Sequence, residues 1–135
     1  GTLHTNYEGK AQAAVDALLK DGYDFVYVHV EAPDEMGHQG SLERKITSIE
    51  LLDSRLVKVV KEQMDASGEA YRMLIAPDHP TPIALRTHTS DAIPFVLYDN
   101  TMERRRIAQY NEKEATAILE GLVANENVDL EKKKK

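Results

Sequence analysis

Apolar residues in the first part of the chain recur at helical spacing and are followed by a short continuous apolar run. Positions 11–19 carry apolar side chains every three or four residues, which predicts a helix over residues 6–20 that Thr5 caps and Gly22 ends. Residues 25–30 read Phe-Val-Tyr-Val-His-Val and are rich in β-branched and aromatic side chains. A run of this length and content predicts a strand buried in a sheet.

A long apolar face dominates the middle of the chain. After the capping residue Ser41, apolar side chains step by three or four residues from Leu42 to Met64, which predicts one helix with a single apolar face. Two further apolar runs, residues 71–76 and 93–98, predict strands. The segment between them is rich in proline, threonine and serine, which is typical of a loop.

The order of these elements indicates the fold class. Helices that alternate with strands predict an α/β fold, in which helices cover a largely parallel sheet. A last helix over residues 111–122 fits the same architecture, so we expect residues 1–124 to form one domain. The charged residues 125–135 predict a disordered tail.

Composition and charge narrow the classes of function. The chain has 135 residues, with 17 basic and 23 acidic side chains and a formal net charge of −6. An acidic body argues against a nucleic-acid surface, which needs a basic patch. The absence of cysteine excludes a disulfide framework and a thiol nucleophile. Every apolar run is far shorter than the ~20 residues that span a bilayer, so we expect neither a nucleic-acid nor a membrane partner.

Histidine and aspartate residues gather where the predicted strands end. Asp34 and His38 follow the first strand, Asp78 and His79 follow the second, and His88 lies in the loop that leads to the third. Because the carboxyl ends of parallel strands meet at one edge of a sheet, we expect these five side chains to converge. Three imidazoles and two carboxylates are a suitable ligand set for two divalent cations.

A pair of cations would give this cluster a chemical role. Two ions about 3.5–4 Å apart stabilise both the attacking and the leaving oxygen of a displacement at phosphorus. Gly37, between Asp34 and His38, permits a tight turn that aims both side chains at one ion. The alternative is a non-catalytic α/β module, because loop histidines and aspartates commonly serve as surface or turn residues.

Three segments resemble one known family. They are residues 23–40 (YDFVYVHVEAPDEMGHQG), residues 76–82 (APDHPTP) and residues 86–95 (RTHTSDAIPF). The sequences of these segments, and their order along the chain, resemble the C-terminal part of cofactor-independent phosphoglycerate mutases of the archaeal-type branch, within the alkaline phosphatase superfamily. The resemblance extends to about residue 124 and implies an alkaline-phosphatase-like α/β fold.

The resemblance also implies roles for the cluster. Asp34, His38 and His88 match the three ligands of one metal ion, and Asp78 and His79 match two ligands of a second. We expect two divalent ions, with Mn²⁺ first and Zn²⁺, Mg²⁺ or Co²⁺ as alternatives, because histidine with carboxylate ligands suits Mn²⁺ or Zn²⁺ better than Mg²⁺. The resemblance further implies a phosphoglycerate substrate, an isomerase activity in glycolysis through a phosphoserine, and a cytoplasmic location.

The chain also departs from that family. No segment resembles the family's N-terminal aspartate strand, its nucleophilic serine loop or its lid-like insertion, and the sequence opens with Gly1. Ser41 fits a helix cap and Ser90 lies beside a ligand, so neither replaces the nucleophile. We therefore expect a C-terminal fragment that has no catalytic residue of its own, is inactive alone and is partnered by the missing N-terminal part of its chain. Phosphopentomutases, sulfatases and phosphodiesterases with similar ligands are alternatives.

Overall fold

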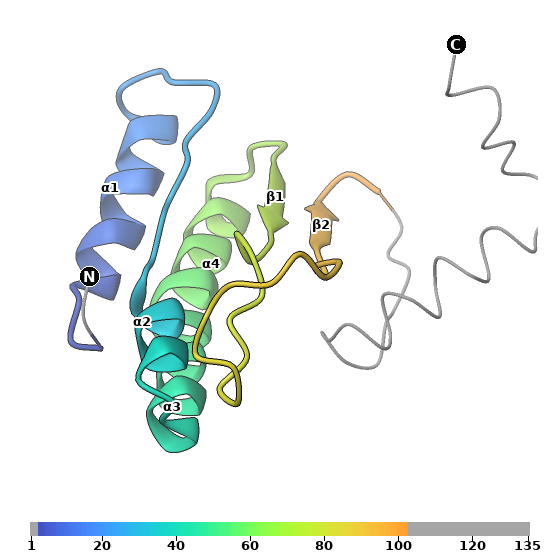
Figure 1. The fold of residues 1–135 in the computed structure, drawn as a ribbon. Coiled ribbons are helices and arrows are strands. Elements are labelled where there is room, and N and C mark those ends of the chain that lie inside the picture. The colour runs from blue at the N-terminus through green and yellow to red at the C-terminus, as the bar shows by residue number, and fades with distance from the viewer. Residues whose placement is uncertain (1–2, 103–135) are drawn as a thin grey trace, which may run out of the picture.

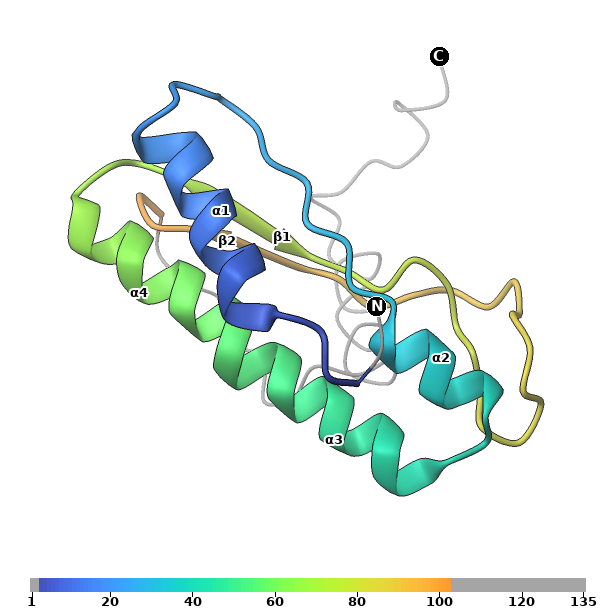
Figure 2. The ribbon, with the colours of Figure 1, turned by 90° about the vertical axis from the view of Figure 1, so that its left-hand side faces the viewer.

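A row of helices lies beside a short two-stranded ladder in the computed structural model, which describes residues 3–102 (Figure 1). The elements, in chain order, are α1 (Tyr7–Leu19), α2 (Ala32–His38), α3 (Leu42–Leu52), the π-helical turn η1 (Asp53–Val57), α4 (Lys58–Ser67), β1 (Arg72–Ile75) and β2 (Val96–Asp99). Because α3, η1 and α4 follow one another without a break, they form one long rod (Figure 2).

The first helix is confirmed, but its cap is one residue later than predicted. The side chain of Asn6, rather than that of Thr5, accepts a hydrogen bond from the Gly9 amide at 2.9 Å. A cap of this kind satisfies one of the amides that a helix start leaves without a partner. Asn6 therefore fixes the point at which α1 begins and places Tyr7 in its first turn, where that side chain is fully buried.

The long central helix is also confirmed, but only part of its apolar face is covered. Ser41 caps it as predicted, by accepting from the Arg44 amide, and Gly68 ends it at a positive φ of 75°. Leu56 is buried, whereas Leu42 is 61% exposed. Within residues 3–102, the apolar face thus finds its packing partners near η1 and α4 and has few along α3.

The core lies between α1, the rod and the extended segment that follows α1. Tyr7, Ala11 and Leu56 form its buried centre. Partly buried apolar side chains surround these three, namely Val28, Val30, Leu51, Leu52, Val57, Val59 and Val60. Helix propensity alone does not hold such short helices, so this shared apolar contact is what keeps α1 on the rod.

The two strands pair antiparallel, with Leu74 opposite Leu97. Residues 76–95, which join them, contain no helix. Parallel neighbours need a crossover connection, usually a helix, whereas a loop that turns the chain back gives an antiparallel pair. The predicted parallel sheet is therefore wrong for the one pair of strands formed within residues 3–102.

Residues 25–30 are extended but form no ladder with β1 or β2, so the strand predicted there is absent from the described chain. They still alternate as a strand does. Val28 and Val30 pack against the core, whereas Phe25 and Tyr27 are 79% and 74% exposed. A strand forms only when another extended segment offers backbone N–H and C=O groups beside it. The apolar pattern of residues 25–30 does not indicate which segment that is.

The predicted helix over residues 111–122 and the predicted tail over residues 125–135 lie outside the described residues. No helix among residues 3–102 has both the length and the apolar character that crossing a bilayer requires.

Acid is expected to weaken the ladder through Asp99. Hydrogen bonds from the Thr101 hydroxyl, the Arg72 guanidinium and the Thr101 amide lower the pKa of Asp99 from 3.8 to about 2. Because the folded pKa lies below the unfolded one, the stabilisation is complete above about pH 4 and is lost as the pH falls toward 2. Urea unfolding midpoints measured between about pH 5 and pH 2 should therefore fall more for the wild type than for Asp99→Asn. The exposed Asp24→Asn variant should follow the wild type, and parallel curves for Asp99→Asn and the wild type would contradict this role.

Candidate metal centre

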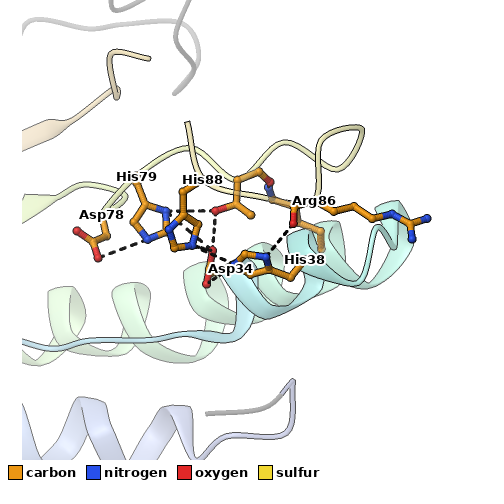
Figure 3. A network of polar contacts seen from close by, with 8 residues as sticks. Asp34, His38, Asp78, His79, Arg86 and His88 are labelled. Carbon is orange, nitrogen blue, oxygen red and sulfur yellow. Dashed lines mark hydrogen bonds and ion pairs between the residues drawn. The ribbon is translucent and has the colours of Figure 1, made fainter. Parts of the chain in front are cut away.

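The loop over residues 76–95 runs past α2, and this brings the histidines and aspartates of two distant segments together (Figure 3). Asp34 and His38 lie on α2 itself, not on the tight turn that Gly37 was expected to form. Pro33 at the start of α2 suits the first helical turn, where its missing N–H is not needed. A spacing of four residues then sets both side chains on one face of the helix.

Asp34, His38 and His88 form a compact set of three donors. The Nε2 atoms of His38 and His88 are 3.0 Å apart. His88 Nε2 lies 3.2 Å from Asp34 Oδ1, and His38 Nε2 lies 3.4 Å from Asp34 Oδ2. Ligands about 2.0–2.1 Å from a tetrahedral ion are separated by about 3.3 Å, so the three donor atoms fit around one cation.

A backbone contact orients His38 for this role. His38 Nδ1 lies 2.9 Å from the carbonyl oxygen of Arg86, which can only accept a hydrogen bond, so Nδ1 donates and the lone pair of the neutral ring stays on Nε2. Arg86 has a φ of 53°, in the left-handed region that costs a non-glycine residue about 1 kcal/mol. Because Nε2 of His38 keeps its lone pair and faces Asp34 and His88, it is the ring atom that is able to bind a metal.

Asp34 is poised to be ionised. Partial burial raises its pKa, but the hydrogen bond from Thr81 and the neighbouring rings of His38, His88 and His79 together lower that pKa below its ordinary value of 3.8. A carboxylate that is charged near neutral pH is the form that binds a divalent cation.

Asp78 and His79 lie at the other end of the same cluster. His79 Nδ1 is 3.9 Å from Asp34 Oδ1, and His79 Nε2 is 3.7 Å from Asp78 Oδ2. The His79 ring stacks on the His88 ring with centroids 3.5 Å apart. All five predicted residues therefore gather in one place, although Asp78 and His79 form a separate pair beside the set of three.

Sequence reasoning missed one residue that joins the two groups. Thr81 is buried, and its hydroxyl contacts both Asp34 and His79. The one feature of the sequence that pointed to Thr81 was its position two residues after His79 in the same short loop. A threonine in a proline-rich segment is ordinary turn chemistry, and only the fold of the loop over α2 shows the contact.

The donor set suits a divalent metal ion. Imidazole and carboxylate together are common ligands of Zn²⁺ and Mn²⁺, and Asp34, His38 and His88 each offer one ligand atom within 4.8 Å of the other two. Asp78 and His79 offer two donors only, so a second ion there would need ligands from beyond these residues.

Comparisons with known proteins agree with this chemistry. The model of a family described as the metalloenzyme superfamily matches residues 2–128. The chain is 56% identical over 98 residues to a 2,3-bisphosphoglycerate-independent phosphoglycerate mutase of Methanosarcina acetivorans, over 73% of this chain and 24% of that protein. It is 47% identical over 131 residues to a probable mutase of the same name from Geobacter sulfurreducens, over 96% of this chain and 32% of that protein.

The fold comparison extends the likeness to a solved structure. A Pyrococcus horikoshii protein matches with a TM-score of 0.70 and 28% sequence identity, over 86% of this chain and 34% of that one. This chain spans about a quarter to a third of the length of the curated relatives named above. The resemblance read from the sequence is thus confirmed, and the match over residues 2–128 shows that the chain belongs to the metalloenzyme superfamily.

Proposed function

We propose that this chain is the metal-binding part of a phosphoglycerate mutase, which interconverts 2- and 3-phosphoglycerate through a phosphoserine. The observation that carries the proposal is the Asp34–His38–His88 cluster, in a chain that is 47% to 56% identical to curated proteins with that name. We propose that the site binds two divalent ions. Mn²⁺ is the first choice of metal, because imidazole and carboxylate ligands suit Mn²⁺ or Zn²⁺ better than Mg²⁺.

The two groups of side chains have separate proposed tasks. Asp34, His38 and His88 hold one ion, while Asp78 and His79 supply part of the site for the other. When bound, the ions neutralise phosphate charge and lower the pKa of a serine hydroxyl. That serine is proposed to come from outside this chain, since the Ser41 side chain caps α3 by accepting from the backbone and Ser90 lies beside the candidate ligand His88 in the sequence.

The charge of the chain supports a fixed order of binding. Its net charge is −6, and the candidate site itself contains the carboxyl groups of Asp34 and Asp78. This field repels a phosphorylated substrate until cations occupy the site and reverse its sign. Metal is therefore proposed to bind before substrate.

Charged phosphoglycerates do not cross a bilayer unaided, so we place the activity in the cytoplasm.

A chimeric enzyme tests the proposed function. This chain would replace the matching segment of the Geobacter sulfurreducens relative, with which it shares 47% identity, and conversion of 3- into 2-phosphoglycerate would be measured with Mn²⁺. We expect the chimera to be active and the chain alone to be inactive. His88→Ala should lower activity by about 100-fold or more, since losing even an outer partner of a ligand costs 10–100-fold. Glu35→Gln, on the same helix as Asp34, is the matched control.

Two outcomes would contradict the proposal. A folded chimera that hydrolyses phosphate or sulfate esters without isomerising phosphoglycerate would indicate a phosphodiesterase-like, sulfatase-like or phosphopentomutase-like relative. A folded chimera whose activity is the same with and without His88→Ala would indicate that the histidines are structural.

A further inference from the structure

Thr81 occupies a buried position between the two groups of candidate ligands. Only 4% of its surface is exposed. Its Oγ1 donates to Asp34 Oδ1 at 2.5 Å and lies 3.2 Å from Nδ1 of His79. One hydroxyl group therefore touches a member of each group.

The number of protons on that hydroxyl decides the direction of both contacts. Thr81 has a single hydroxyl proton, and the ionised carboxylate of Asp34 can only accept one. The proton therefore points to Asp34, and the Thr81 oxygen meets His79 with a lone pair. To hydrogen-bond with it, Nδ1 of His79 must carry the proton of the neutral ring. The lone pair of His79 is then left on Nε2, the atom that faces Asp78 at 3.7 Å.

We propose that Thr81 is a positioning residue that sets the orientation of the Asp34 carboxylate and the tautomer of His79 at the same time. This inference rests on the proposed function, because it gives that metal centre an outer partner shared by both groups. Outer partners of this kind fix ring orientation, and their loss typically weakens metal binding 10–100-fold.

The backbone of Thr81 is itself held in place. Lys45, on α3, donates from Nζ to the Thr81 carbonyl at 2.7 Å. Gly37, on α2, packs directly beneath, since a Cβ built there would lie 2.7 Å from the same carbonyl oxygen. Two helices thus fix the point from which the hydroxyl reaches Asp34. The alternative is that Thr81 only fills space, in which case its methyl group matters and its hydroxyl does not.

The experiment compares Thr81→Val, which keeps the shape and removes the hydroxyl, with Thr81→Ser, which keeps the hydroxyl. Thr89→Val is the matched control. It also removes a hydroxyl from this loop, but that hydroxyl donates to Asp91, which is not a candidate ligand. Mn²⁺ affinity of the full 135-residue chain is measured by calorimetry. The ring nitrogens of His79 are assigned by ¹⁵N NMR on the metal-free chain.

We expect Thr81→Val to bind Mn²⁺ about 10–100-fold more weakly than the wild type, and Thr81→Ser and Thr89→Val to bind it nearly as well. In the metal-free wild type, His79 should carry its proton on Nδ1, and Thr81→Val should lose that preference. Equal affinity in Thr81→Val and the wild type would overturn the proposal.

The NMR measurement separates this inference from the proposed function. A wild-type chain that binds no Mn²⁺ would count against the metal centre, whereas a wild-type His79 protonated on Nε2 would overturn the role of Thr81 on its own. That second result needs no variant, so it holds even if Thr81→Val does not fold. Gly37→Ala, which crowds the Thr81 carbonyl, should weaken Mn²⁺ binding in the same direction as Thr81→Val.

Discussion

Replacing Asp34 with Asn is expected to abolish the thermal stabilisation that Mn²⁺ gives to this chain. A ligand that binds only the folded state at 100 times its Kd stabilises that state by about 2.7 kcal/mol. For a chain of 135 residues this raises Tm by about 10 °C. Asp34 is the one carboxylate in the set of three donors, and it contacts both His38 and His88. Without its charge, two neutral imidazoles are left to hold a divalent ion.

The measurement is a melting curve with and without saturating Mn²⁺, for Asp34→Asn and for Glu35→Gln. Glu35 lies in the same first turn of α2 and is absent from the donor set, so its variant controls for the loss of a negative charge nearby. We expect the shift to persist in Glu35→Gln and to vanish in Asp34→Asn. An equal shift in both variants would mean that Mn²⁺ binds elsewhere on this acidic chain.

The second large effect is expected at Tyr7, at the start of α1. Its side chain is fully buried against Ala11 and Leu56, and its hydroxyl donates to the Leu3 carbonyl at 3.2 Å. Replacing a buried aromatic side chain with alanine costs about 3–5 kcal/mol, a large share of the 5–15 kcal/mol that typically stabilises a domain. We therefore expect Tyr7→Ala to be largely unfolded at 37 °C.

Two matched variants separate the ring of Tyr7 from its hydroxyl. Tyr7→Phe removes only the hydrogen bond and should cost about 1 kcal/mol. Tyr23→Ala removes a tyrosine that is 63% exposed and should change the free energy of unfolding little. Urea unfolding followed by circular dichroism measures all three. If Tyr7→Ala and Tyr23→Ala unfold at the same urea concentration, the core does not depend on α1.

Helices were more predictable than the sheet, because a helix forms its hydrogen bonds within one segment. The spacing of apolar residues from Leu42 to Met64 located the rod, and Ser41 marked its start correctly. Residues 25–30 carry an equally clear strand pattern, yet pairing depends on which backbone lies alongside. The direction of the β1–β2 pair likewise depends on the path of residues 76–95, which local propensity does not determine.

The gathering of the candidate ligands could be predicted from the sequence, but their arrangement could not. Asp34, His38, Asp78, His79 and His88 were singled out by residue type and position, and they do gather. They gather because a loop crosses a helix, whereas the prediction relied on parallel strand ends. The Arg86 carbonyl and the Thr81 hydroxyl escaped prediction, because a backbone oxygen and a loop threonine have no sequence signature for such contacts.

The exposed side chains of residues 25–30 have a practical consequence for work with this chain. Phe25 and Tyr27 project outward from an extended backbone that no ladder occupies within residues 3–102. Exposed apolar side chains on an extended segment favour contact with other molecules, including further copies of the same polypeptide. Sedimentation of the purified protein should therefore show self-association that grows with concentration, and melting or titration experiments belong in the dilute range where the monomer prevails.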